Sequence, residues 1–129
     1  MHTLFATLIT FALLVQTAGA PGRVVNLVLP RSLNENEGVA VELKLGVLAR
    51  GAEIQVETTS GRMLGVISPY GIRPGNEAGT YAVPVPLEAI SNQRVSLRIT
   101  LSHNHNKRAP SNKEVRSVRL QITSANEEK

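Results

Sequence analysis

The sequence lacks cysteine, tryptophan and aspartate altogether, and aromatic residues make up only 3% of its 129 positions. Without cysteine the chain can form no disulfide and no thiolate metal site. The scarcity of aromatics also argues against specific single-stranded nucleic-acid recognition, which relies on stacking side chains. The apolar residues are mainly Val, Leu, Ile and Ala, which pack well on pleated sheets. The fold must therefore be held together by aliphatic packing.

Residues 1–20 have the pattern of an export leader. An uncharged apolar stretch, Leu4 to Val15, precedes the small residues Ala18, Gly19 and Ala20. This arrangement is typical of a signal peptide cleaved after Ala20, and the stretch is shorter than the ~20 residues that span a bilayer. The segment has no Lys or Arg, so a buried helix or a retained anchor is the alternative. We expect a periplasmic or secreted protein, bacterial rather than eukaryotic, without a transmembrane span after leader removal.

The rest of the chain, residues 21–129, alternates apolar and polar positions with period two. In residues 39–48 the side chains of Val39, Val41, Leu43, Leu45 and Val47 can share one face. Such alternation predicts strands with one buried face. The same pattern predicts strands over 25–29, 53–57 and 94–101, and weaker patterns predict three more over 62–67, 80–87 and 116–123.

About seven short strands separated by turn residues predict one all-β domain, a small two-sheet antiparallel β-sandwich. Pro84 and Pro86 place the strand over 80–87 at an edge, or require it to leave its sheet midway, because proline cannot donate to a ladder. Residues 69–79 and 102–113 are expected to be loops.

Two short stretches resemble sandwich modules of known type. The run Glu77-Ala78-Gly79-Thr80-Tyr81 resembles the D-x-G-x-Y motif of immunoglobulin-like domains, with Glu in place of Asp. Alternatively, residues 81–87 and 94–101 are similar to the consecutive late strands of fibronectin type III-like modules. The two alignments give these strands different places in the sandwich. Resemblance to a superfold implies no function.

Candidate catalytic residues are few, because all acidic residues are Glu and the only histidines after the leader are His103 and His105. No nucleophile-elbow or phosphate-loop motif is present. In an extended chain His103 and His105 project to one side, and they could form a weak metal site or an enzyme centre. We expect no cofactor and no catalysis, with a small envelope metal-binding protein or enzyme as the alternative.

Charge is distributed unevenly along the chain. Five glutamates and two cations lie between Glu35 and Glu57, whereas seven cations and one glutamate lie between Arg94 and Arg119. If the strands that carry Arg94, Arg98 and Arg119 were paired, they would form a cationic patch. The candidate residues for contact with a polyanion are Arg94, Arg98, Lys107, Arg108, Arg116 and Arg119.

The loop over residues 69–79 carries a further candidate contact. Tyr70 and Arg73 are of the residue types most enriched in binding hot spots, and loops of this length often bind partners. A rigid crossover and a merely solubilising set of arginines are the simpler alternatives. The sequence favours a non-catalytic binding, adhesion or accessory-assembly module of the cell envelope, whose partner is another envelope protein or an anionic polymer.

Overall fold

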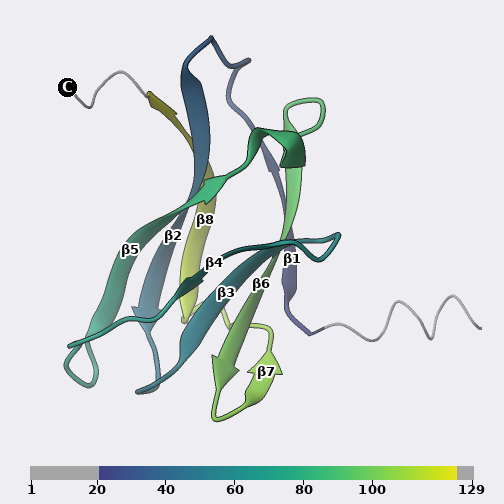
Figure 1. The fold of residues 1–129 in the computed structure, drawn as a ribbon. Helices are drawn as coiled ribbons and strands as arrows, with labels where there is room; N and C mark the ends of the chain where they lie inside the picture. Colours follow the sequence, from purple (N-terminus) through teal and green to yellow (C-terminus); the bar gives the residue numbers. More distant parts are fainter. Residues whose placement is uncertain (1–20, 125–129) are drawn as a thin grey trace, which may run out of the picture.

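A computed structural model describes residues 21–124, which form strands and one short 3-10 helix (Figure 1). The proposed leader, residues 1–20, lies outside the described residues. The strands are β1 (Arg23–Val28), β2 (Glu37–Val47), β3 (Glu53–Thr58), β4 (Met63–Ile67), β5 (Glu77–Val85), β6 (Arg94–His103), β7 (Asn106–Arg108) and β8 (Val115–Ser124); the helix η1 (Leu87–Ala89) lies between β5 and β6.

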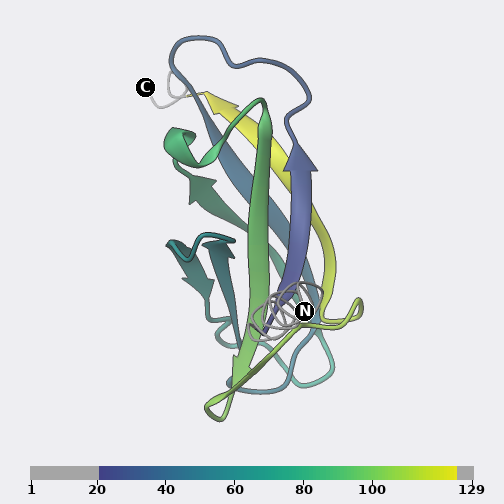
Figure 2. The same cartoon turned by 90° about the vertical axis from the view of Figure 1, so that its right-hand side faces the viewer.

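The strands form two antiparallel sheets that pack face to face (Figure 2). The first sheet has the order β1-β6-β3-β4, with β7 also paired to β6, and the second has the order β5-β2-β8. Every pairing is antiparallel. The all-β, two-sheet prediction is confirmed, and each of the seven predicted strands is present.

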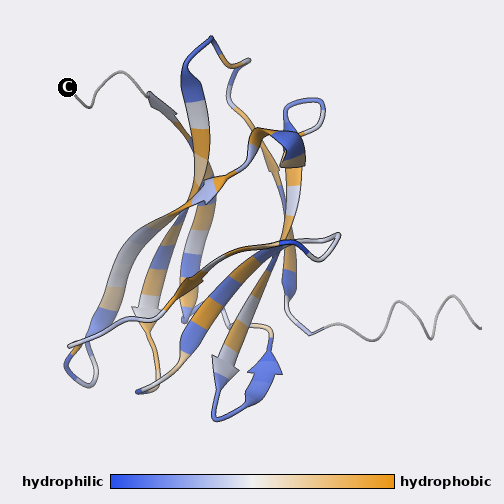
Figure 3. Ribbon diagram, in the orientation of Figure 1, coloured by the Kyte–Doolittle hydropathy of each residue, from blue (hydrophilic) through white to orange (hydrophobic). Residues whose placement is uncertain are grey.

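The core lies between the two sheets and is almost entirely aliphatic. Leu43 on β2, Ile54 on β3 and Leu97 on β6 are fully buried at 0% exposure. Their neighbours along each strand, such as Lys44, lie on the outer faces, which gives the striped hydropathy seen in Figure 3. The predicted inward set on β8, Val118, Leu120 and Ile122, packs against this core and stays partly exposed.

The proline-containing strand lies at a sheet edge, as predicted. β5 pairs with β2 alone, and Pro84 stands on its exposed face opposite Ala40. The strand ends at Val85, and Pro86 immediately precedes η1. Both prolines thus avoid the positions where a missing N–H would break a central ladder.

The strand order departs from that of immunoglobulin constant domains. There the first strand shares a sheet with the second, and the last shares a sheet with the sixth. Here β1 pairs with β6 and β8 pairs with β2, so the two terminal strands exchange sheets. Tyr81 lies on β5, where its hydroxyl donates to the carbonyl of Ala78 at 2.9 Å. The structure establishes a two-sheet antiparallel fold, and it does not assign the chain to the immunoglobulin-like or the fibronectin type III-like superfold.

The expectation of a plain loop over residues 102–113 is wrong in its first half. β6 continues to His103, and β7 returns beside it with His103 opposite Asn106. The turn residues Asn104 and His105 have φ values of 53° and 68°. Left-handed conformation at both central residues is typical of a type I′ hairpin turn. Asn and His both adopt it more often than most residues other than glycine. The turn lacks the Asn-Gly or Asp-Gly dipeptide that marks such a hairpin in a sequence, and this explains why the pattern did not reveal it.

Candidate binding surface at the loop end

A groove opens at the end of the sandwich where β2 turns into β3 and β4 connects to β5, low in Figure 1. We call this end, with the β6–β7 turn and the segment before β8, the loop end. The groove has a volume of about 560 Å³. Its lining is mainly apolar, with Tyr70, Arg50 and Arg73 as the large polar members; the apolar members are Leu48, Ala49, Ala52, Pro69, Ile72, Pro74 and Ala78.

Tyr70 lies in this groove lining but is 96% exposed. Its loop is shaped by Gly71 and Gly75, whose φ values of 74° and 85° favour glycine. The amide of Asn76 donates to the carbonyl of Arg73 at 3.1 Å and closes the turn before β5. Tyr70 and Arg73, proposed from the sequence as contacts on one loop, both line the same groove.

The loop is tied to the first sheet at its start. The hydroxyl of Ser68 donates to Glu53 Oε2 at 2.9 Å, which joins the end of β4 to the start of β3. Glu53 and Glu57 lie on the outer face of β3, as expected of surface charges rather than a catalytic pair. The Glu53 carboxylate, next to the groove residue Ala52 in the sequence, therefore accepts a hydrogen bond from the start of the loop.

The guanidinium groups of the groove are not neutralised by carboxylates. Arg50 and Arg73 form no ion pair within the described residues, and both are exposed. Lys107, on β7 at the same end, is also exposed and forms no ion pair within residues 21–124. The loop end thus combines an apolar groove with positive charge available to a partner.

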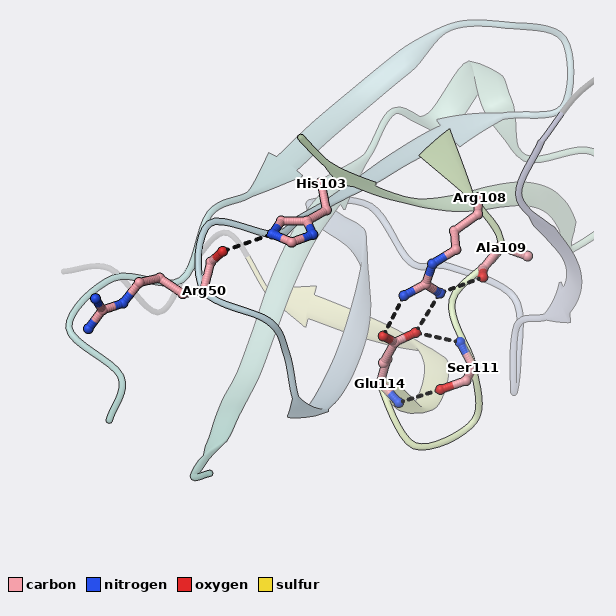
Figure 4. A network of polar contacts seen from close by, with 6 residues as sticks. All are labelled: Arg50, His103, Arg108, Ala109, Ser111 and Glu114. Atoms are coloured by element: carbon pink, nitrogen blue, oxygen red, sulfur yellow. Dashed lines mark hydrogen bonds and ion pairs between the residues drawn. The ribbon is translucent and has the colours of Figure 1, made fainter. Parts of the chain in front are cut away.

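His103 is partly buried at the end of β6, whereas His105 is exposed in the turn that follows. His103 Nε2 lies 3.0 Å from the carbonyl oxygen of Arg50, so this ring links the β6 hairpin to the β2–β3 turn (Figure 4). His105 lies in the exposed turn. No group of three or more potential metal-ligating side chains occurs within residues 21–124. The neighbouring carboxylate, that of Glu114, is engaged elsewhere.

Glu114 forms a two-pronged ion pair with Arg108, with both nitrogen–oxygen distances at 2.8 Å (Figure 4). The amide of Ser111 also donates to Glu114 Oε1 at 2.9 Å, and the Ser111 hydroxyl accepts from the Glu114 amide at 3.2 Å. The hydrogen bonds from Arg108 lower the pKa of Glu114 to about 2. Arg108, a predicted polyanion contact, therefore serves first to close the loop before β8.

The arginine-bearing strands do not pair, so the condition for a shared cationic patch is not met. β6, which carries Arg94 and Arg98, belongs to one sheet, and β8, which carries Arg116 and Arg119, belongs to the other. The physical reason is that β8 joins the second sheet by pairing with β2, which turns its apolar face toward the core between the sheets. A single cationic patch spanning both strands does not form.

Three of the predicted strand cations lie beside glutamates on other strands of their own sheet. Arg119 donates to Glu42 at 2.7 Å, and Arg116 pairs with Glu77. Arg98 lies 3.9 Å from Glu57, and its Nε is buried without a hydrogen-bond partner in the described structure. Of the predicted set, Arg94 and Lys107 form no ion pair within residues 21–124.

Arg94 lines a second, more polar hollow of about 440 Å³. This hollow lies between the β3–β4 turn and η1, where Arg62 and Glu88 are 3.8 Å apart. Cationic, acidic and hydroxyl groups are mixed along its walls, so it favours no class of ligand as clearly as the groove at the loop end.

The residue that sequence reasoning missed is Arg50. Its Arg50-Gly51 dipeptide indicated only a turn, and nothing in a single sequence shows that this turn faces a loop some 20 positions later. The link from His103 to the Arg50 carbonyl is equally non-local. An arginine in a candidate turn was visible in the sequence, but its position in the same groove lining as Tyr70 was not.

The structure defines the class of this chain as a two-sheet antiparallel β-protein with a groove at its loop end. No protein-family model, no curated protein and no solved structure matches it. Within residues 21–124, no helix has the length and apolar character needed to cross a membrane.

Proposed function

We propose that this protein is a non-catalytic binding module that is exported to the cell envelope and contacts a protein or anionic polymer through its loop end. The single observation that carries the proposal is Tyr70, 96% exposed at an apolar groove that also holds two unpaired arginines. Tyrosine and arginine dominate binding hot spots, and binding sites are commonly apolar hollows with a few polar groups.

The fold supports this proposal by its arrangement of loops. A sandwich like the immunoglobulin- and fibronectin-like modules it resembles offers a rigid scaffold with loops gathered at its ends. The core pairing of β2 with β5 and of β3 with β6 fixes the strand ends from which the groove residues extend. Export to the envelope is inferred from the leader pattern of residues 1–20 alone.

The test compares capture by the wild-type protein and by Tyr70→Ala, using extract from the native compartment. Tyr70 has no packing role, so the variant should fold normally, while affinity for the captured partner should fall by roughly 30-fold, as for a hot-spot residue. Val66→Ala is the matched control, because Val66 is 48% exposed on β4 and does not line the groove. Equal binding by wild type and Tyr70→Ala would refute the loop end as the contact surface.

A further inference from the structure

The outer edge of β8 is the longest unprotected strand edge in the described structure. β8 spans ten residues, Val115–Ser124, and pairs with β2 on one side. It contains neither proline nor lysine. From Ser117 to Thr123 no backbone hydrogen bond to another described strand is present besides those to β2. Exposed strand edges of this kind present free N–H and C=O groups and pair readily with another strand.

The other edges of the two sheets are shorter or interrupted. β5 carries Pro84 in its ladder, and β4 has only five residues, with a register shift against β3 at Val56/Glu57. β1 has six residues and β7 three. Short strands, prolines and bulges are the usual means of preventing edge pairing. Within residues 21–124, β8 therefore has the longest edge that contains neither a proline nor a register shift beyond its first residues.

The free stretch of β8 is symmetric about Leu120. The guanidinium of Arg23 contacts the carbonyl of Val115 at 3.4 Å, and a register shift at Lys44/Leu45 marks the start of β8, so regular pairing runs from Ser117. We infer that Ser117–Thr123 pairs antiparallel with the same segment of a second copy of this chain, related by a twofold axis at Leu120. The two β5-β2-β8 sheets would then join into one continuous sheet.

The side chains favour this register over its neighbours. If the twofold axis lay at Arg119 instead of Leu120, the Arg119 side chains of the two copies would lie directly opposite each other and repel. With the axis at Leu120, Arg119 faces Gln121 of the second copy, and Val118 faces its Ile122. The aliphatic side chains, which a single copy leaves partly exposed, then gain apolar neighbours across the axis. This is an isologous contact of the kind that closes as a dimer.

The test is sedimentation equilibrium of the protein purified after expression of the full-length sequence, over a range of concentrations. We expect a monomer–dimer equilibrium. Gln121→Glu should tighten it and Gln121→Arg should weaken it, each by roughly 2- to 30-fold, because each dimer contains two cross-strand pairs of residue 121 with Arg119. Thr80→Glu and Thr80→Arg carry the same charge changes on the exposed face of β5 and should leave the equilibrium unchanged.

Cross-linking gives a second readout of the register, since the chain has no cysteine of its own. A mixture of Arg119→Cys and Gln121→Cys proteins should form disulfide-linked dimers faster than either variant alone, because opposed strand residues lie within disulfide reach. The inference is overturned if the wild type stays monomeric at millimolar concentration. It is equally overturned if the dimer responds alike to changes at positions 121 and 80, or if Gln121→Cys alone cross-links as fast as the mixture.

Discussion

At the scale of single residues, two loops of this protein are closed by the same device. Arg31 donates two hydrogen bonds to the carboxylate of Glu37, and Arg108 donates two to that of Glu114. The residues of each pair are six positions apart, and all four distances are 2.8 Å. In both loops the amide three residues before the glutamate also donates to its carboxylate. These hydrogen bonds, chiefly from the arginine side chain, lower the pKa of Glu37 and of Glu114 to about 2.

The pH dependence of Glu114→Gln tests the pair at the loop end. The pKa of Glu114 falls from 4.5 to about 2 on folding, so its stabilising contribution is complete above pH 4.5 and is lost as the pH falls toward 2. At pH 7 the variant should lose about 1 kcal/mol or less of unfolding free energy, because Arg108 is half exposed. Urea titrations at successive pH values should show the two proteins converging near pH 2; a deficit that persists undiminished there would contradict the assignment.

Replacement of a core leucine tests the burial assignment. Leu43 is fully buried between the sheets, and Leu43→Ala should lower the unfolding free energy by ~2–5 kcal/mol through lost burial and a residual cavity. Lys44→Ala, one position along on the exposed face of β2, should change it by ~0.5 kcal/mol or less. Guanidinium denaturation followed by circular dichroism measures both. Similar losses at the two positions would show that the face assignment of β2 is wrong.

At the scale of elements, the contact between β2 and the segment before β8 depends on one glycine. A Cβ at Gly46 would lie 2.0 Å from the carbonyl oxygen of Lys113, so Gly46→Ala must displace this backbone. We expect a loss of ~1–3 kcal/mol, as for overpacked sites. Gly38→Ala, where the nearest atom is the Thr123 hydroxyl at 3.1 Å, is the control and should cost less. Thermal unfolding that ranks Gly38→Ala as the more damaging change would contradict this account.

The strands could be predicted from the sequence because each carries its own period-two pattern. Val39, Val41, Leu43 and Leu45 show which face of β2 is buried before any partner is known. The prediction that Val47 shares this face is wrong, because the alternation ends after the register shift at Lys44/Leu45 and Val47 is 47% exposed. The turn at Asn104-His105 and the register shift at Lys44/Leu45 could not be predicted, since they depend on backbone conformations that these residue types adopt only in context. The lack of space for a side chain at Gly46 is caused by Lys113, which is nearly 70 positions away in the sequence. The residues around Gly46 therefore give no sign of it.

At the scale of the whole molecule, sheet membership decides which charges meet. Arg98 and Arg119 belong to a basic stretch of sequence, yet each lies beside a glutamate from the acidic stretch, Glu57 and Glu42 respectively. Strand order is set by long-range packing, which a single sequence does not specify, so the sequence could not show whether the strands that carry these arginines pair. Arg50 and Arg73 in the groove lining, and Lys107 at the same end of the sandwich, form no ion pair within residues 21–124.

Heparin chromatography separates the contribution of the loop end from that of charge in general. The triple variant Arg50→Gln, Arg73→Gln and Lys107→Gln should elute at distinctly lower salt than the wild type, because these cations are exposed and unpaired. The control triple variant Arg62→Gln, Arg116→Gln and Arg119→Gln removes the same net charge.

In the control the substituted cations each face a glutamate, so their field is already partly cancelled and elution should shift less. A larger shift for the control would locate anion binding on the strand faces instead of the loop end. Retention by the wild type that did not weaken with added salt would contradict an electrostatic contact altogether, because exposed charges are screened over about 10 Å at 0.1 M salt.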